Sequence, residues 1–248
     1  MTQSVPDTTG AQHRGPSLVT VAIVFTLLFV ASLVGSMAMA GGQHYPSPYE
    51  SLQVASLYFN EHANAVRLGS FFQFGAAIPL AIFTATAVSR LQFFGINVAG
   101  AHIALVGGVL ASLMGALSAL LNWTISWPDV AAMPSLHMLH VAAFATGGPG
   151  FVVPFGLLVA GISVAGGLAR LLPRWLMWFG LVIAGLAELS SLTLILYAGA
   201  FLLPAARFLG LVWMICVGAE LPKSRARHGG ERARTPGTAA PAGAHVST

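Results

Sequence analysis

One carboxylate lies deep inside an apolar stretch of the sequence, and its position is the first chemical feature to explain. Glu188 is the 14th residue of the apolar run 175–198, which places it about 20 Å along a helix from the start of that run. A carboxylate at this depth in a bilayer costs at least ~2.5 kcal/mol unless it is paired, protonated or hydrated. Arg67 and Arg207 each open an apolar run from the side nearer to Glu188. We therefore expect one of them to be its partner.

Small residues surround Glu188 in the sequence, including Ala184, Gly185, Ala187 and Ser191. Small residues at helical spacing favour close helix packing, so this face is expected to pack into a bundle rather than meet lipid. Two interpretations follow. Glu188 with Arg67 or Arg207 is either a buried ion pair that fixes helix register, or part of a site that binds a solute or handles a proton.

Histidines are the second group of candidates. His137 and His140 are three residues apart, so they are neighbours on one helical face and are candidate binding residues. A metal site needs three or four converging ligands. His62 and Asp129 are the further residues that could join this pair, but they supply no second pair at helical spacing. We predict no metal ion and no cofactor.

The composition determines which solvent these residues meet. The 248 residues are 56% hydrophobic and 7% charged, against about 25% charged residues in soluble domains. So apolar a chain needs lipid around most of its surface. The formal charge of +4 comes mainly from the C-terminal tail, which favours contact with anionic lipid rather than with nucleic acid. Cys216 is the single cysteine, so an internal disulfide is excluded.

Six apolar runs are long enough to cross a bilayer. They comprise residues 17–40, 66–88, 96–121, 151–172, 175–198 and 201–221. The sequence therefore predicts an all-α fold, a polytopic bundle of six transmembrane helices over residues 17–221.

The segments outside these runs are predicted to behave in two ways. Residues 49–64 mix apolar and polar side chains, which is typical of a helix at the membrane interface. Residues 134–146 are apolar but half a span long, so they form an interfacial or a re-entrant helix. The polar segments 1–16 and 222–248 are expected to be disordered.

Charges in the short loops alternate in sign and predict the orientation. Arg90 follows the second run, Arg170 and Arg174 separate the fourth and fifth, and a basic cluster follows the sixth. The remaining loops carry the acids Glu50, Glu61 and Asp129. Because basic loops stay in the cytoplasm, we expect a bacterial inner-membrane protein with both termini cytoplasmic. The oligomeric state is left open.

Two internal patterns concern packing. Pro79 follows His62 by 17 residues, and Pro154 follows His137 by the same interval, so runs two–three and four–five are candidates for a tandem hairpin repeat. The third run carries small residues at four-residue spacing, which predicts a seam where another helix approaches closely. They are Gly107, Ala111, Gly115 and Ala119.

The residue pattern of three blocks resembles that of an uncharacterised bacterial family of six-helix integral membrane proteins, a domain of unknown function. The blocks are YFNEHANAVRLGSFFQFGAAIPLAIFTATAVSRL, ATGGPGFVVPFGLLVAGI and PRWLMWFGLVIAGLAELS. Together with the positions of Arg67, Glu188 and Arg207, the resemblance covers about residues 18–222. It implies a membrane fold and no particular activity.

Three functions are compatible with these residues. The first is a non-enzymatic membrane protein with a polar pocket in its outer half, built from Arg67, Glu188 and Arg207 and roofed by the segment around His137 and His140. Such a pocket would bind or move a small solute or proton, or sense the envelope. The second is a membrane-embedded enzyme acting on a lipid or isoprenoid, and the third is a structural or partner-binding subunit.

Overall fold

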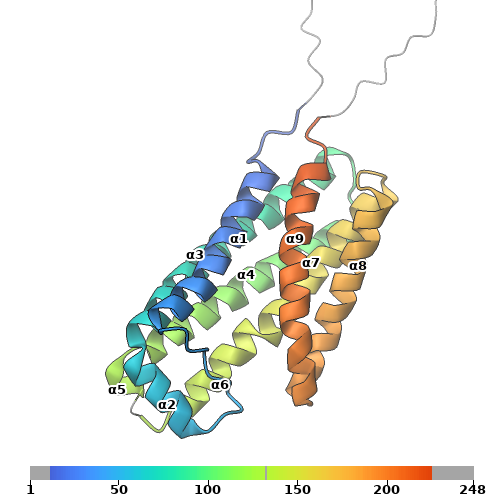
Figure 1. The fold of residues 1–248 in the computed structure, drawn as a ribbon. Helices are drawn as coiled ribbons and strands as arrows, with labels where there is room; N and C mark the ends of the chain where they lie inside the picture. The colour runs from blue at the N-terminus through green and yellow to red at the C-terminus, as the bar shows by residue number, and fades with distance from the viewer. Residues whose placement is uncertain (1–11, 132, 225–248) are drawn as a thin grey trace, which may run out of the picture.

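The computed structural model describes residues 12–131 and 133–224, which form an all-α bundle (Figure 1). Its α-helices are α1 (Leu18–Met39), α2 (Leu52–Glu61), α3 (Ala63–Phe93), α4 (Ala99–Ile125), α5 (Pro128–Ala131), α6 (Leu136–Gly147), α7 (Pro149–Leu168), α8 (Arg174–Leu189) and α9 (Leu202–Glu220). Two short 3₁₀ helices, η1 (Ser190–Leu194) and η2 (Tyr197–Phe201), connect α8 to α9.

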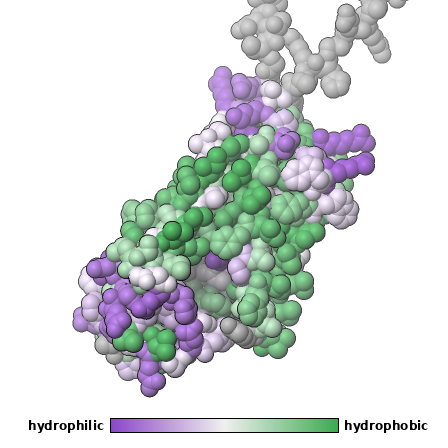
Figure 2. All heavy atoms as spheres, in the orientation of Figure 1, coloured by the Kyte–Doolittle hydropathy of each residue, from purple (hydrophilic) through white to green (hydrophobic). Residues whose placement is uncertain are grey.

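Six segments of the described chain are long and apolar enough to cross a membrane. They are Leu18–Met39, Ala63–Phe93, Ala99–Ile125, Leu136–Leu168, Arg174–Leu194 and Ala198–Glu220. A wide apolar surface separates two more polar ends of the molecule (Figure 2). The prediction of a six-span polytopic bundle is confirmed.

The fourth span begins earlier than the apolar run 151–172 indicates. It combines α6 and α7, which follow one path antiparallel to α4: Ser118 of α4 donates to the Ala143 carbonyl of α6, and Gly107 of α4 faces Leu158 of α7. The helix is interrupted at Gly148, but the chain continues in the same direction. It does not turn back, which disagrees with the re-entrant alternative for residues 134–146.

The small residues of α4 allow a close contact with α7 in the bundle core. A β-carbon added to Gly107 would lie 2.6 Å from both the Leu158 nitrogen and the Pro154 oxygen of α7. Gly108, its neighbour, faces Thr84 of α3 in the same way. Because larger side chains would hold these backbones apart, the seam on the third run is a packing feature, as predicted.

The two segments of the predicted repeat each form a packed hairpin. α3 packs on α4 and α7 packs on α8, and the two hairpins meet through α4 and α7. Pro79 lies inside α3 and Pro154 inside α7. The arrangement is compatible with a duplication, which stays a prediction.

Both ends of the described chain meet at one end of the bundle, here called the terminal end (Figure 1). His13 donates its backbone N–H to the Lys223 carbonyl at 2.9 Å, and Arg90, 1% exposed, donates to the Leu221 carbonyl at 3.0 Å. His13 also bonds to Ser89 of α3. His13 and Lys223 belong to the segments 1–16 and 222–248 that are predicted to be disordered, and these contacts hold them in place. The remainders of the two segments, 1–11 and 225–248, lie outside the described residues.

Candidate functional site

A cavity of about 450 Å³ lies at the opposite end of the bundle, here called the α2 end. Its wall is formed by α1, α3, α4, α6, α9 and the α1–α2 loop (residues 40–51). Figure 2 shows the surface hollowed between the polar α2 end and the apolar surface of α9. The polar side chains of the lining are Ser32, Ser36, Tyr45, Ser47, Ser70, Gln73, Ser118, Asn122 and Arg207.

Arg207 is the single charged side chain among the described residues that line this pocket. Its guanidinium carbon lies 5.4 Å from the ring centre of Phe29 and 4.9 Å from that of Phe151, and its Nη2 donates to the Gly147 carbonyl. Its Nε is buried without a hydrogen-bond partner in the described part of the chain. The guanidinium is therefore held by two ring faces and one carbonyl, and it keeps N–H groups for a ligand.

The break between α6 and α7 provides that carbonyl. Phe151 and Val152 both donate their backbone N–H to the Gly148 oxygen, and Pro149 has no N–H to donate. The Gly147 oxygen is therefore left to accept from Arg207. The sequence Gly147-Gly148-Pro149 thus places an acceptor beside the cation at the pocket wall.

The hydroxyl groups of the pocket are oriented by the helices behind them. Ser32 donates to the Gly69 carbonyl across the α1–α3 contact at 2.9 Å, and Ser70 donates to the Val66 carbonyl of its own helix. Because these hydrogens are already used, the serine oxygens face the pocket as acceptors.

Asn122 links the α4 wall to the α1–α2 loop. Its Oδ1 accepts a hydrogen bond of 2.5 Å from the Tyr45 hydroxyl. Burial, with Tyr58 nearby, raises the pKa of Tyr45, so this hydroxyl stays protonated and donates. The amide hydrogens of Asn122 remain available, and this side chain adds a second donor to the pocket.

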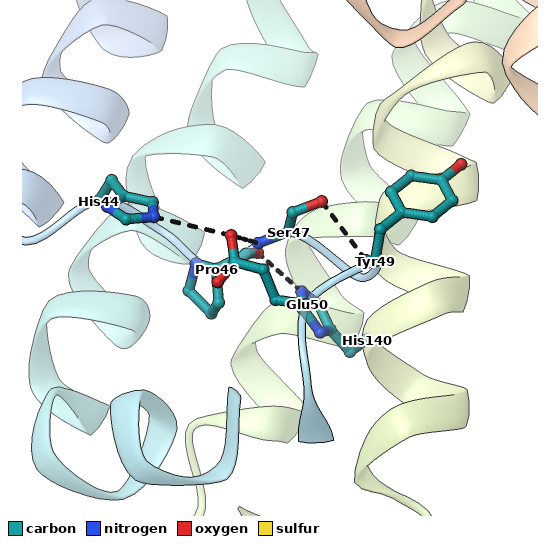
Figure 3. A network of polar contacts seen from close by, with 6 residues as sticks. All are labelled: His44, Pro46, Ser47, Tyr49, Glu50 and His140. Atoms are coloured by element: carbon teal, nitrogen blue, oxygen red, sulfur yellow. Dashed lines mark hydrogen bonds and ion pairs between the residues drawn. The ribbon is translucent and has the colours of Figure 1, made fainter. Parts of the chain in front are cut away.

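The α1–α2 loop covers the pocket through a network of its own (Figure 3). Ser47 donates its backbone N–H to the Glu50 carboxylate at 3.2 Å, and His44 lies 3.7 Å from the same oxygen. The His140 Nε2 bonds to the Pro46 carbonyl at 3.1 Å. A carbonyl can only accept, so His140 carries its proton on Nε2 and ties the loop to α6.

Of the residues predicted as candidates, the structure brings Arg207 and His140 to this pocket. Arg207 lines it directly, and His140, 1% exposed, holds Pro46 in its wall. His137, the neighbour of His140, is exposed. The predicted segment around His137 and His140 therefore contributes to the cover through one histidine.

The structure contradicts the predicted surroundings of Glu188. Its side chain is exposed, and a β-carbon on Gly185 would meet no atom within 4 Å. The packed face of α8 contains Gly180, Ala184 and Ala187. At 100° per residue, Glu188 is turned about 80° from Gly180 and about 100° from Ala187, so it lies at the edge of the packed face.

Arg67 is engaged elsewhere, so the predicted ion pair is absent from the described residues. Its guanidinium donates to the side chain and carbonyl of Ser126 at 3.4 and 3.2 Å and lies 5.3 Å from the Trp127 ring centre. It therefore caps the end of α4. The one salt bridge in the described chain joins His44 and Glu50, so neither arginine pairs with Glu188.

The metal-ligand candidates do not assemble in the structure. Among the described residues, no three histidine, cysteine, aspartate or glutamate side chains lie close enough to hold an ion. His62, His137, His140 and Asp129 thus form no common site. The absence of a metal ion and of a cofactor stays a prediction.

Several pocket residues were not singled out from the sequence. Gln73, Ser118, Asn122 and Tyr45 belong to no motif in the sequence. One signal was available: Ser70 and Gln73 are three apart, and Ser118 and Asn122 are four apart. Each pair lies on one face of a span near the same end.

No protein-family model, no curated protein and no solved structure matches this chain. The resemblance to an uncharacterised six-helix family therefore has no support from the comparisons. The chain is a multi-pass integral membrane protein with six candidate membrane-spanning helices in its described part.

Proposed function

We propose that this multi-pass membrane protein is a non-enzymatic inner-membrane protein that binds a small solute with an anionic or strongly accepting group in the pocket at the α2 end. The observation that carries this proposal is Arg207, which lines the pocket as a cation and whose buried Nε–H has no hydrogen-bond partner among the described residues. No carboxylate lines that pocket in the described residues. The local charge is positive, and a negative group is its complement.

The charge distribution supports placing this pocket on the outer side of a bacterial inner membrane. The terminal end carries Arg90, Arg170 and Arg174, whereas the α2 end carries Glu50, Glu61 and Asp129 and, of the basic residues near it, Arg67, which is bonded to Ser126. Basic residues stay on the cytoplasmic side. A pocket at the α2 end is then reached from outside the cytoplasm.

Binding is favoured over catalysis by the state of the hydroxyl groups. Ser32, Ser70 and Ser118 each donate to a backbone carbonyl, so none is activated by a base. His140, which bonds to Pro46 in the pocket wall, donates its Nε2 proton to the Pro46 carbonyl. A nucleophile needs an adjacent general base, and the described lining offers no such pair.

The test uses one pocket variant and one matched charge variant. Wild type, Arg207→Gln and Glu188→Gln are purified from the same membranes, and the small molecules that copurify are extracted and quantified by mass spectrometry. We expect at least one molecule with an anionic group to accompany wild type and Glu188→Gln at similar stoichiometry. Its amount falls about tenfold or more in Arg207→Gln, because a charge-assisted hydrogen bond is lost.

Glutamine at position 207 keeps an amide donor but carries no charge, so Arg207→Gln removes the cation and leaves a polar side chain. If the copurifying molecules are the same in all three proteins, the pocket is not a solute site. If Glu188→Gln loses the molecule and Arg207→Gln retains it, the site lies on the exposed face of α8 instead.

A further inference from the structure

The pocket is walled partly by residues on the membrane-facing surface. Leu33 of α1 is 43% exposed and Phe208 of α9 is 47% exposed, and both line the cavity. Both belong to segments long and apolar enough to span a bilayer. The cavity therefore reaches the surface that lipid chains cover.

α1 and α9 are in contact over only part of their length. Near the terminal end, a β-carbon on Gly218 would lie 2.8 Å from the Val19 nitrogen. Midway along, the Phe29 and Phe208 rings are 6.2 Å apart. Beyond these rings, toward the α2 end, the two helices separate around the pocket (Figures 1 and 2).

The α2-end side of the same cavity is covered. Tyr45 is bonded to Asn122, and Pro46 is bonded to His140 (Figure 3). The α1–α2 loop lines this side of the cavity and is tied to α4 and α6, so it restricts access from water. The opening between Leu33 and Phe208 leads to lipid. A ligand using this opening needs an apolar part that stays there and a polar part that reaches Arg207.

We infer that the ligand of this pocket is an anionic amphiphile that enters sideways from the bilayer between α1 and α9. This inference rests on the proposed binding function and specifies its ligand. The anionic group meets the guanidinium of Arg207 and the amide of Asn122. The hydrocarbon chain leaves along Leu33 and Phe208. A volume of about 450 Å³ suits a headgroup with the first part of a chain, within the usual size range of ligand pockets.

Titration with three probes distinguishes a pocket that binds an amphiphile from one that binds a soluble anion. The full chain, stripped of lipid in a neutral detergent, is titrated with dioleoyl phosphatidylglycerol, with dioleoyl phosphatidylcholine, and with glycerol 1-phosphate, which has no acyl chain. Native mass spectrometry gives the bound fraction. We expect saturable binding of one phosphatidylglycerol, at least about tenfold tighter than phosphatidylcholine, and at least about tenfold weaker binding of glycerol 1-phosphate. Arg207→Gln removes the preference between the two lipids.

A variant pair tests the side opening. Leu33→Trp narrows the gap between α1 and α9, whereas Val34→Trp places the same side chain next to it, on an exposed part of α1 outside the pocket lining. Leu33→Trp is expected to weaken phosphatidylglycerol binding several-fold, and Val34→Trp to leave it unchanged. Equal melting temperatures of the two variants show that both are folded.

Two outcomes overturn the inference, and they differ in what they leave standing. If the two lipids bind equally, the contact is nonspecific lipid at the helix surface. If glycerol 1-phosphate binds as tightly as phosphatidylglycerol, the acyl chain contributes nothing to binding. The same conclusion follows if a soluble anion copurifies and none of the three probes binds. The pocket is then a site for soluble anions, and the proposed function survives. If no probe binds and nothing copurifies, both proposals fail.

Discussion

Arg207 and Glu188 are both charged residues in apolar segments, but one side chain faces the interior of the bundle and the other faces outward. Each is a charge inside an apolar run, and each costs free energy to place in hydrocarbon. Arg207 turns inward, where Phe29, Phe151 and a free carbonyl receive it. Glu188 turns outward and finds no cation in the described chain. The two charges therefore do not neutralise one another.

Replacing Glu188 is expected to cause no loss of stability. In Glu188→Leu the exposed carboxylate disappears, and no hydrogen bond or ion pair with a described residue is broken. The free energy of unfolding in detergent stays equal or rises, because an apolar side chain suits this surface better. Thermal unfolding followed by fluorescence measures the change.

Arg90→Ala is the control for this prediction. Arg90 is 1% exposed and donates to Leu221, so its removal should lower the melting temperature clearly. A drop of similar size in Glu188→Leu would show that Glu188 has a structural partner after all.

At the scale of the helices, the α4–α7 contact holds the two hairpins together. The sequence showed this contact from one side only, as small residues spaced four apart on α4. Which helix would fill the seam was not readable, because many alanine- and glycine-rich segments have the same texture. In the structure this helix is α7. The backbone atoms of Pro154 and Leu158 occupy the space that a side chain at Gly107 of α4 would need.

Two glycine substitutions separate packing from helix propensity. Gly107→Ala brings a β-carbon to within 2.6 Å of α7 backbone atoms, so we expect a loss of about 1–3 kcal/mol from overpacking. Gly185→Ala places the same methyl group in open space on α8, where alanine gains up to ~1 kcal/mol of helix propensity. Chemical denaturation in mixed micelles compares both with wild type. If the two variants behave alike, α4 and α7 are not in close contact.

Helix ends were harder to predict than helix existence. The apolar run 151–172 predicts the fourth span, and Gly147, Gly148 and Pro149 in front of it are residues that interrupt helices. The break is real, but α6 continues on the same path and adds residues from Leu136 onward to the span. Composition marks where a helix is interrupted, whereas the direction of the next helix depends on tertiary contacts such as Ser118 with Ala143.

At the scale of the whole molecule, an even number of spans brings both described ends of the chain to one side. The contacts of His13 with Lys223 and Ser89 agree with this arrangement. The direction in the membrane follows from loop charge and is testable with single cysteines. Gln43 and Gln92 are both exposed and lie at opposite ends of the bundle.

In a Cys216→Ala background, Gln43→Cys and Gln92→Cys are expressed in bacteria and treated with a membrane-impermeant maleimide. With cytoplasmic termini, Gln43→Cys reacts in intact spheroplasts and Gln92→Cys reacts only after lysis, because basic loops stay inside. The reverse pattern would overturn the orientation, and with it the outer position of the pocket. Labelling of both before lysis would contradict the number of spans.

The sequence by itself determined the solvent, the number of spans and the small-residue seam, because these depend on composition and on the period of one helix. It also indicated that Arg207, a charge in an apolar run, needs polar or aromatic partners inside the bundle. Only the tertiary structure decided which partners these are. The position of a side chain around its helix is set by which face packs, and on α8 that face is Ala184 with Ala187. Glu188, at the edge of that face, is exposed, while Phe29, Asn122 and Gly147, far apart in the chain, come together at the pocket of Arg207.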